Sequence, residues 1–516
     1  MAGLESGWNR TGGGRDFSAK REGRGSVDRQ RRVSRAPPAP YPAPSDATVR
    51  QNEEFWRDQV PVGHTVFFAT CARGLGEYLA MELDPQYERA GQRQFGTIVH
   101  QVLPSGVFFS ANALAGGYAA SLWSRTATRV LAELAVLELP ENPDASPAQE
   151  VYEAVQNAVD WSAVVLPGMT ISVTTRVALG EMLNQNTLRI RVKDAVCDAL
   201  RAAVGEKPLP PAENVQANVP LFITLNRTEL RVYRDLAGAS LHKRGYKGES
   251  AMHRSSLNET VAAGMLYMSG ATPTELVPDI SKRFQGSKKK PVVVDPMCGS
   301  GTLLCEAALL DLQIAPGLFR QEFCFECWPD HDAKAFQALL DHAHDCRREA
   351  ARFDFWGNDV HGASVRLAQK GSVRAGLDDV IRWTNSDVLD VPRPGEVSMT
   401  GLAWTCGAVV LTLSNPPWGM RLNDGSDELF SSDAAYDGDD QSDMGTEQSW
   451  KALGNFLREC APESSAYLLS GSSFYSRFLR LKADRRMPVR IGNVDCRVLK
   501  YDIGPRRFPA RKSPSA

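Results

Sequence analysis

Four consecutive residues, Asn415, Pro416, Pro417 and Trp418, follow directly after the apolar run 409–413 and could perform chemistry on an aromatic amine. Such an amine is a poor nucleophile because its lone pair is delocalised into the ring. The side-chain oxygen of Asn415 and the carbonyl oxygen of Pro416 could accept the two amine hydrogens, in a geometry that the prolines fix. The indole of Trp418 could stack on the base, which is worth about 1–3 kcal/mol. A plain Asn-Pro turn is the alternative, but the place after a buried-type strand favours methyl transfer to an exocyclic amine.

A second candidate group is the loop 295–302, whose sequence is Asp-Pro-Met-Cys-Gly-Ser-Gly-Thr. It follows a run of three valines and opens a helical pattern, so Gly299 and Gly301 would let the backbone pass close to a ligand at a helix start. The loop is neither a Gly-x-Gly-x-x-Gly motif nor a P-loop, because no Gly-Lys-Ser/Thr follows. A carboxylate at Asp295 suits a cationic group, such as the amino group of S-adenosylmethionine. Cys298 would lie near that cofactor without a nucleophilic role, and an ordinary glycine turn is the alternative.

Two further acids could complete a cofactor site. A nucleotide-type cofactor needs an acid at the end of the next strand to hold the ribose hydroxyls, and Asp359 fits that place. It comes much later than the roughly 20 residues usual in one βαβ unit, so an insertion over 311–352 must lie between. Asp387 ends a further segment and could reach an adenine amine. For both acids the alternative is a cap at the end of a loop.

The elements that must position these residues alternate between strand and helix from Pro291 onward. The apolar patterns predict strands over 292–294, 356–360, 409–413 and 466–469, and helices over 303–310 and 363–375. Such alternation is typical of a doubly wound, mostly parallel sheet.

The first half of the chain has a different pattern. It predicts strands over 65–70, 106–109, 169–175, 221–226 and 229–234, with helices over 74–83, 113–123 and 191–203. Interleaved helices and antiparallel-type strand pairs indicate an α+β region. A glycine-rich connection, 236–251, then leads to a helix over 257–268.

Length and composition limit the class of protein. The chain has 516 residues and a mass of 56.5 kDa, which is typical of two to four domains. With 43% hydrophobic and 23% charged residues it does not resemble a disordered or fibrous chain. No run approaches the ~18 consecutive apolar residues of a membrane span, so a membrane role is excluded. Ten cysteines, scattered along the chain, indicate reduced thiols inside a cell.

Charge is unevenly distributed along the chain. Residues 1–50 carry ten Lys and Arg against five Asp and Glu, and residues 1–60 are expected to be a disordered basic arm. A transit peptide to a mitochondrion or plastid is the alternative, against which the acids argue; cytoplasm and organelle both stay open. The segment 423–447 carries nine acids and no base. It is expected to be a solvated surface loop, or else a gate that repels misplaced phosphates.

A zinc site is a weak alternative for part of the insertion. Cys324 and Cys327 have the spacing of a ligand pair, with three histidines and a further cysteine after them. Because no matched second pair follows, we expect no metal.

The combined motifs resemble the THUMP-domain guanine-N2 RNA methyltransferases, and within that family the N-terminal module of the bacterial large-subunit rRNA enzymes. The similarity extends from about residue 66 to about 501. Besides the two loops and the tetrad, it includes collinear stretches at 68–75, 123–129, 160–162, 191–195, 242–246 and 481–486, with Asn493 and Cys496.

The resemblance implies an α/β fold: a Rossmann-like class I methyltransferase domain preceded by an α+β ferredoxin-like part and a THUMP domain. The implied order is an arm at 1–60, a ferredoxin-like part at 61–115, a THUMP RNA-binding domain at 116–236, a linker and helix at 237–290, the methyltransferase domain at 291–505 with the acidic insertion 423–447, and a tail at 506–516. The implied cofactor is S-adenosylmethionine, held by Asp295, Cys298, Gly299, Gly301, Asp359 and Asp387. The implied catalytic residues are Asn415, Pro416, Pro417 and Trp418. The long gap before Asp359 is usual in that family.

The sequence departs from the family in three respects, one of which is the acidic segment 423–447, an insertion just after the Asn415 tetrad. Trp418 stands where those enzymes usually have tyrosine, so stacking is retained and a phenol hydroxyl is lost. The second methyltransferase module that those enzymes often carry does not follow, so no second methylation is expected.

Several hypotheses about function stay open. The expected partner is RNA, with large-subunit rRNA first and tRNA second. DNA adenine methylation uses the same Asn-Pro-Pro-aromatic device, although the RNA-binding resemblance of the first half argues against it. A ribosome-assembly factor that binds RNA without catalysis is the alternative from another class, and the oligomeric state stays undetermined.

Overall fold

The computed structural model describes residues 55–85, 95–140, 146–177, 183–248, 257–278, 284, 290–391, 408–418 and 441–505, with side chains from 445 in the last range. The chain divides into units 1–42 and 43–516, and all described residues belong to the second. Most of the predicted basic arm, and the acidic segment up to residue 440, therefore lie outside the described residues. The disorder expected for the end of the arm is wrong, because Trp56 is 4% exposed and its ring stacks on His100 with centroids 4.8 Å apart. The surface loop expected for the end of the acidic segment is also wrong, because residues 441–447 form the start of a helix in which Thr446 is buried. Among the helices described, none is long and apolar enough to cross a membrane.

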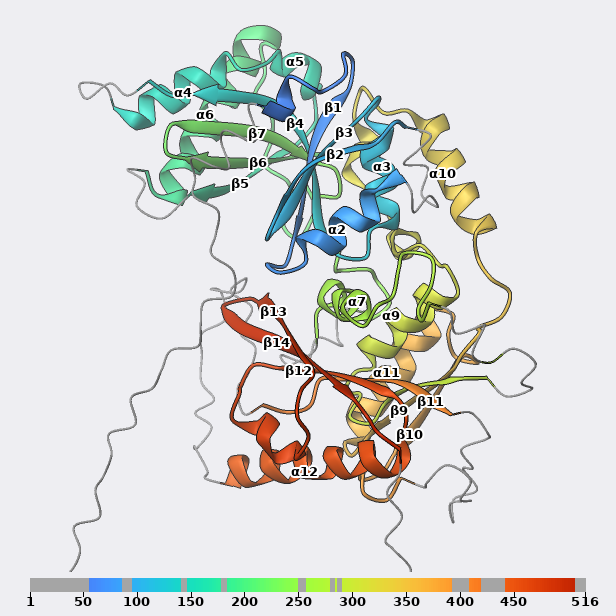
Figure 1. Ribbon diagram of the computed structural model, residues 1–516. Helices are drawn as coiled ribbons and strands as arrows, with labels where there is room; N and C mark the ends of the chain where they lie inside the picture. Colours follow the sequence, from blue (N-terminus) through green and yellow to red (C-terminus); the bar gives the residue numbers. More distant parts are fainter. Residues whose placement is uncertain are drawn as a thin grey trace, which may run out of the picture. The chain divides into compact units, whose positions relative to one another are not determined.

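The first half forms a seven-stranded sheet in the order β2-β3-β1-β4-β7-β6-β5 (Figure 1). Neighbouring strands are antiparallel, except for the parallel pair β5–β6. The strands are β1 (Thr65–Cys71), β2 (Ile98–Leu103), β3 (Gly106–Ala111), β4 (Ala127–Glu138), β5 (Ile171–Val177), β6 (Val219–Asn226) and β7 (Glu229–Asp235). The helices are α2 (Gly76–Leu83), α3 (Ala115–Trp123), α4 (Pro147–Gln156), α5 (Trp161–Val164) and α6 (Gln185–Val204). Strands β1 and β4 pair, so one sheet contains strands from both sides of the domain boundary predicted near residue 115. That boundary stays a prediction.

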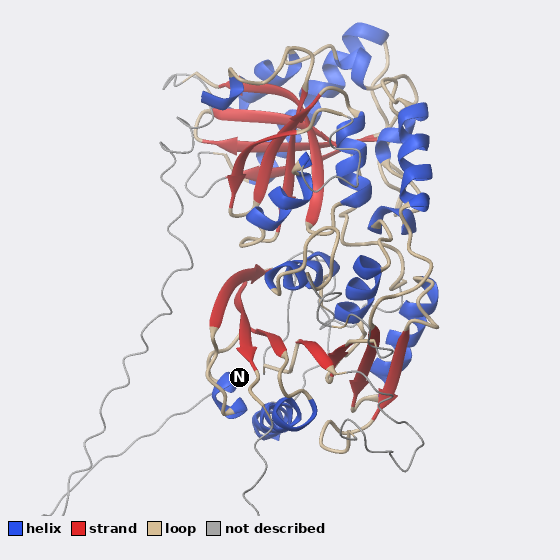
Figure 2. Cartoon of the chain, turned by 45° about the vertical axis from the view of Figure 1, so that its right-hand side comes forward, coloured by secondary structure: helices blue, strands red, loops and turns tan. Residues whose placement is uncertain are grey.

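The second half forms another seven-stranded sheet, in the order β10-β9-β8-β11-β12-β14-β13. The first five of these strands are parallel, and β14 runs antiparallel to both β12 and β13. The strands are β8 (Val292–Asp295), β9 (Asp354–Asp359), β10 (Ile381–Asn385), β11 (Val409–Ser414), β12 (Ser465–Ser470), β13 (Arg485–Ile491) and β14 (Val494–Asp502). Helices α7 (Glu259–Met268), α9 (Thr302–Asp311), α11 (Gly362–Arg374) and α12 (Gln441–Cys460) belong to this half. Helices flank both sheets (Figure 2), so the predicted α/β class is confirmed.

The strand order of the second sheet determines where a ligand can bind. β8 pairs with β9 on one side and with β11 on the other, so the chain reverses its direction of travel across the sheet at β8. In open parallel sheets, ligands bind beyond the carboxyl ends of the strands at such a switch point. The loops after β8, β9, β10 and β11 all leave the sheet at that edge.

The insertion predicted at 311–352 is structured. It contains the short 3-10 helices η3 (Pro316–Phe319) and η4 (Cys324–Cys327) and the helix α10 (Ala333–Asp345). The ring of Phe325 stacks on Tyr118 of α3 with centroids 4.0 Å apart, and His331 Nδ1 lies 3.2 Å from the Tyr118 hydroxyl. The insertion therefore packs on a helix of the first half, and α10 lies beside α3 in Figure 1.

A buried polar cluster also connects the two halves, and its first centre is Glu82 at the end of α2. The Glu82 carboxylate accepts hydrogen bonds from Ser124 Oγ at 2.6 Å, from the Arg125 backbone at 2.8 Å and from the Tyr267 hydroxyl of α7 at 2.8 Å. Because Glu82 is 7% exposed, these donors replace the water that a carboxylate would otherwise need. The bonds hold α7 against the first half.

The second centre of the cluster is Glu306, in the middle of α9. Arg244 Nη1 lies 2.8 Å from Glu306 Oε2, an ion pair without hydrogen-bond geometry, and the Tyr246 hydroxyl donates to Glu306 Oε1 at 2.9 Å. Burial raises the pKa of Glu306, an effect that Arg244 and Arg125 oppose. Arg125 also donates to the carbonyl of Ile314 at 2.7 Å. Helix α9, which begins at the glycine loop, is thus anchored by cations from outside the second sheet.

We expect Arg244→Ala to lower the free energy of unfolding by about 3–5 kcal/mol, because it leaves a buried carboxylate without its ion partner. Urea denaturation followed by circular dichroism measures the change. Arg201→Ala is the matched control, since the Arg201–Asp198 pair is exposed and such pairs contribute at most ~1 kcal/mol. Equal destabilisation by the two variants would contradict the role of the Arg244–Glu306 pair.

Candidate active site

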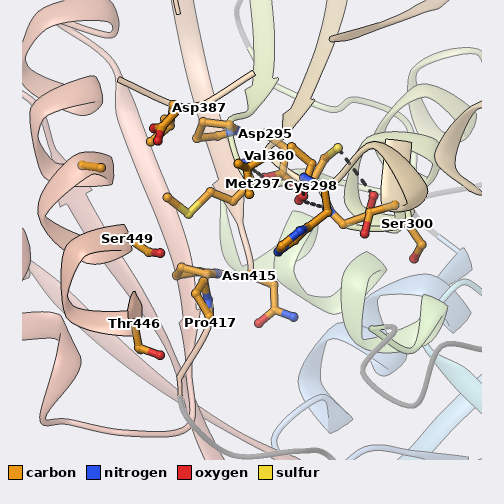
Figure 3. A pocket seen from close by; sticks show the side chains of 18 of the residues that line it. Asp295, Met297, Cys298, Ser300, Val360, Asp387, Asn415, Pro417, Thr446 and Ser449 are labelled. Atoms are coloured by element: carbon orange, nitrogen blue, oxygen red, sulfur yellow. Dashed lines mark hydrogen bonds between the residues drawn. The ribbon is translucent and has the colours of Figure 1, made fainter. Parts of the chain in front are cut away.

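A cavity of about 710 Å³ lies at the carboxyl ends of β8, β9, β10 and β11. Nine of the ten residues predicted as site residues line it: Asp295, Cys298, Gly299, Asp359, Asp387, Asn415, Pro416, Pro417 and Trp418. Helix α12 forms a further wall, in part through Thr446 and Ser449. In the view of Figure 3, Asp387 lies at one end of the cavity and Asn415 toward the other, with Met297 and Cys298 between them.

The two glycines of the loop after β8 have different roles. Both have positive φ, +52° at Gly299 and +77° at Gly301, which glycine adopts without strain. A Cβ at Gly299 would meet no atom within 4 Å, so its backbone borders open space. A Cβ at Gly301 would overlap the ring of Trp383 and lie 2.8 Å from Cβ of Ala368. Gly301 is the predicted site residue that does not line the cavity, and it serves the packing of the loop against β10 and α11.

Asp359 holds the loop after β8 in place. Its Oδ2 accepts a hydrogen bond from the Gly299 backbone at 2.8 Å, and its Oδ1 accepts one from the His361 backbone at 2.9 Å. The side chain is 8% exposed. Each carboxylate oxygen has a second lone pair, so Asp359 can also accept hydrogen bonds from the hydroxyls of a ligand.

Asp295 is a buried acid at the end of β8. It is 1% exposed, and its Oδ1 accepts from Ser414 Oγ at 2.8 Å and from the Met297 backbone at 3.1 Å. Burial raises the pKa of Asp295 to about 7, and the nearby Asp359 adds to the rise. A cationic group in the cavity would favour the ionised form of Asp295.

The Cys298 thiol is an unsuitable nucleophile. The residue is 7% exposed, and burial, together with the nearby Asp295, raises the pKa of the thiol well above its usual range. Because the thiolate is the reactive form, Cys298 stays inert near neutral pH.

Asn358 is a site residue that sequence analysis missed. It is fully buried. Its Nδ2 donates to the carbonyls of Ser386 at 2.9 Å and Pro296 at 3.3 Å, while its Oδ1 accepts from Thr384 Oγ1 at 2.9 Å. One amide near the end of β9 thus joins the loops after β8 and β10. The only signal in the sequence that could have identified Asn358 is its position directly before Asp359.

The Asp387 end of the cavity has an apolar character. Val360 and Leu389 line the cavity and are 59% and 61% exposed. The Asp387 carboxylate accepts a hydrogen bond from the Leu389 backbone at 2.9 Å, which fixes that loop. Exposed apolar side chains beside a carboxylate suit a flat heterocycle that carries an amine. Sequence analysis identified Asp387 and overlooked both apolar neighbours.

At the other end, Asn415 and Trp418 contact each other. The indole Nε1 of Trp418 donates to Asn415 Oδ1 at 2.9 Å, and the indole is 5% exposed. A Cβ at Gly471, which follows β12, would overlap the ring of Trp418. The indole Nε1 of Trp450 donates to the Pro417 carbonyl at 2.7 Å. Trp450, on α12, is a second residue that sequence analysis missed, and it fixes the backbone of the tetrad.

The residues of the weak zinc hypothesis make other contacts. Cys324 Sγ donates to the Ala217 carbonyl at 3.3 Å, and Cys346 Sγ lies 3.4 Å from His342 Nε2. Within the described ranges, no group of three or more His, Cys, Asp or Glu side chains is arranged to hold a metal ion.

Two family models match the chain. The model of the RMKL-like methyltransferase domain matches residues 283–430, and the model of the RlmL ferredoxin-like domain matches residues 66–131. The first match contains the Asp295 loop, Asp359 and the Asn415 tetrad. The second contains β1, β2 and β3 and reaches into β4.

Relatives with known names are similar over most of the chain. The ribosomal RNA large subunit methyltransferase K/L of Syntrophotalea carbinolica is 31% identical over 456 residues, which is 87% of this chain and 55% of that protein. This chain spans about half the length of such relatives. A protein of Synechocystis sp. named as a candidate RNA methyltransferase is 28% identical over 437 residues, 85% of this chain and 96% of that protein.

Among solved structures, a protein described as a methyltransferase and crystallised with S-adenosylhomocysteine has a TM-score of 0.63 and 23% identity. The match covers 87% of this chain and all of that chain. At this identity the likeness shows the fold.

We expect Gly301→Ala to lower the free energy of unfolding more than Gly299→Ala does. Both substitutions force a left-handed backbone on alanine, which costs roughly 1–2 kcal/mol, but the Gly301 variant must also displace Trp383 or Ala368. Thermal unfolding of the two variants and the wild type measures the difference. A Gly299 variant as unstable as the Gly301 variant would contradict the packing role of Gly301.

Proposed function

Because the chain belongs to the RMKL-like methyltransferase family, we propose that it catalyses S-adenosylmethionine-dependent N2-methylation of a guanine in RNA, with large-subunit ribosomal RNA as substrate. One observation carries the proposal: Asn415, at the carboxyl end of β11, lines the same cavity as the buried acids Asp295 and Asp359. Asn415, which could accept the hydrogens of a target amine, thus lines the same cavity as Asp295 and Asp359. These two acids suit the ammonium group and the ribose hydroxyls of the cofactor.

The donor set fits the proposed cofactor along the length of the cavity. The Asp295 carboxylate would bind the ammonium group, and Asp359 would accept from the ribose hydroxyls with its remaining lone pairs. Val360 and Leu389 would enclose the adenine ring, with Asp387 near its amine. Gly299 borders the cavity without a side chain and so leaves room for the chain between ribose and ammonium. When bound, S-adenosylmethionine supplies an electrophilic methyl group.

Asn415 and Pro416 would prepare the target amine. The Asn415 oxygen keeps one lone pair for an amine hydrogen while it accepts from Trp418. The Pro416 carbonyl would accept the second hydrogen, so that the nitrogen lone pair localises toward the methyl group. The cavity-facing part of Trp418 would contact the base. The proton is released after transfer, with water as the acceptor, and no covalent enzyme intermediate is needed.

The choice of RNA rests on the relatives and on the first half of the chain. The relative from Syntrophotalea carbinolica is named for large-subunit rRNA, and the ferredoxin-like match belongs to the same kind of protein. A guanine must leave its stack to reach Asn415, which costs a few kcal/mol, so a loop or bulge of rRNA is the preferred site. tRNA is the second candidate. Both the cytoplasm and an organelle with bacterial-type ribosomes would supply such a substrate.

Two rival functions make different demands. DNA adenine methylation would use the same tetrad, but would leave the ferredoxin-like region without a role. An assembly factor that binds RNA without catalysis would not need Asp295, Asp359 and Asn415 together around one cavity.

We expect the wild-type protein to form N2-methylguanosine in deproteinised large-subunit rRNA, and Asn415→Ala to lose this activity at least a hundredfold. The affinity for S-adenosylhomocysteine should stay within about twofold, because Asn415 is proposed to contact only the amine. Nucleoside mass spectrometry and calorimetry measure the two quantities.

Asp359→Ala is the matched variant for this experiment, since it should weaken cofactor binding roughly tenfold or more through loss of a charged acceptor. Substantial turnover by Asn415→Ala would overturn its role. Methylation of bulk tRNA alone would overturn the rRNA substrate, and methylation of DNA adenine would overturn the function.

We expect the affinity for S-adenosylhomocysteine to rise as the pH rises through about 7, the pKa of Asp295. Below that pH the carboxyl is protonated and cannot pair with the ligand ammonium. One linked proton gives a change of roughly tenfold between about pH 6 and about pH 8. Calorimetry on the wild type and Asp295→Asn measures the effect, and the variant should bind weakly with no such pH dependence. A wild-type affinity that is flat over this range would rule out the ionised Asp295 contact.

A further inference from the structure

The segment that follows β12 leaves the sheet beside the Asn415 tetrad. β12 pairs with β11 so that Leu468 lies opposite Ser414, the residue before Asn415. Gly471 then passes so close to Trp418 that a side chain there would overlap the indole. Phe474 comes three residues later, at most roughly 11 Å along the chain. What this segment presents to solvent is therefore presented next to the cavity.

An exposed aromatic side chain and an arginine are stacked on this segment. Phe474 is 47% exposed, and the Arg477 guanidinium lies over its ring at 3.7 Å from the centroid. The same guanidinium lies 4.7 Å from the ring centroid of Phe478. Folding alone does not require Phe474 in solvent, because Tyr475 and Leu479 already anchor the segment in the core. An exposed ring with a guanidinium over it is suited to stacking on a nucleobase.

The chain around this pair is strongly basic. Between Phe474 and Arg486 there is one acid, Asp484, whose carboxylate accepts from the Asp502 backbone at 2.7 Å. The segment has five cations, all exposed: Arg477, Arg480, Lys482, Arg485 and Arg486. Arg485 and Arg486 are neighbours on β13 (Arg485–Ile491), so their side chains leave opposite faces of the sheet. The cations that precede β13, together with the exposed ring of Phe474, suit the phosphates and bases of a single strand.

Helix α12 connects this segment firmly to the wall of the cavity. The 3-10 helix η5 (Tyr475–Leu479) packs on α12, where Arg458 Nη1 donates to the Leu479 carbonyl at 2.9 Å. A Cβ at Gly454 would clash with the same carbonyl oxygen, so the two elements are in close contact. Thr446 and Ser449, earlier in α12, line the cavity. A strand bound to η5 therefore has a fixed position relative to Asn415.

We propose that Phe474 and Arg477 form a stacking site for a nucleotide that flanks the target guanosine, and that Arg480 and Lys482 hold the phosphates of the same RNA strand. The inference rests on the proposed function for the identity of the target base. It adds a single-strand binding site on the methyltransferase half of the chain. Extrusion of the target base would be easier because its neighbour is held on Phe474 while the phosphates are held by the cations.

The test measures RNA affinity separately from catalysis. Fluorescence anisotropy with a fluorescein-labelled RNA stem-loop, which carries guanosines in its single-stranded loop, gives the Kd at fixed salt. We expect Phe474→Ala to weaken binding roughly five- to hundredfold, the range for loss of one stacked base. Phe474→Tyr should retain most of the affinity, because it keeps the ring. In Arg480→Ala/Lys482→Ala, log Kd should depend less steeply on log salt, because fewer phosphate contacts are made.

Val373→Ala is the matched control, since Val373 is also an exposed apolar residue, at 60%. It lies in the last turn of α11, which runs from the carboxyl edge of the sheet back to the opposite edge, away from the cavity. The Kd of Val373→Ala for the RNA should equal that of the wild type. Unchanged affinity for S-adenosylhomocysteine shows that each variant is folded.

Equal RNA affinity in Phe474→Ala, Arg477→Ala and the wild type would overturn the stacking site, whether or not the wild type methylates RNA. Weakened RNA binding together with active wild-type methylation supports both proposals. Weakened RNA binding by the variants, together with a wild type that methylates no RNA, supports the stacking site and overturns the proposed function. If the Phe474 variant keeps its RNA affinity and loses a protein partner instead, the surface is a protein interface and the proposal is wrong.

Discussion

The hydrogen bond from the Gly299 backbone to the buried Asp359 carboxylate is the constraint on which the site depends. It joins the loop after β8 to the end of β9, at the place where the chain reverses its direction across the sheet. Asn358 extends the connection to the loop after β10 with four hydrogen-bonding contacts of its own. These bonds hold the loops in one arrangement, and a site whose loops are held in place loses less conformational entropy when it binds a ligand.

The same edge of the sheet is supported from behind by charged groups that are costly to bury. Glu306 on α9 is in contact with Arg244 and Tyr246, and Arg125 donates to the carbonyls at the end of α9. An apolar contact could be equally stable, but it would specify the position of α9 less narrowly. The ion pair and the Tyr246 hydrogen bond are directional contacts with defined partners, unlike an apolar contact. These contacts hold α9, which begins directly after the glycine loop, against the first half of the chain. That half carries the ferredoxin-like match.

Sequence analysis predicted the cavity-lining residues that follow apolar strands. The runs before Asp295 and Asn415 have the strong pattern of buried strands, and carboxyl ends of parallel strands must meet at one edge. It missed β2, β4, β10, β13 and β14, whose polar side chains interrupt that pattern. It also missed Asn358 and Trp450, because their roles depend on partners that only the fold brings near. Gly301 was assigned to the cofactor on the glycine pattern alone, while the atoms that require glycine there belong to Trp383 and Ala368. The arm 1–54 and residues 419–440 lie outside the part of the chain that the structure describes.

The indole of Trp418 constrains both the Asn415 amide and the segment that follows β12. An indole nitrogen can only donate, so its bond to Asn415 determines that the amide oxygen, and not the amide nitrogen, is on that side. A phenol hydroxyl can both donate and accept, and would leave the orientation of the amide less determined. The indole is also larger than a phenol, and its far edge occupies the space where a side chain at Gly471 would stand. Gly471 begins the segment that leads to Phe474. The close approach of the Gly471 backbone to the Trp418 ring therefore also determines where the basic segment leaves the sheet.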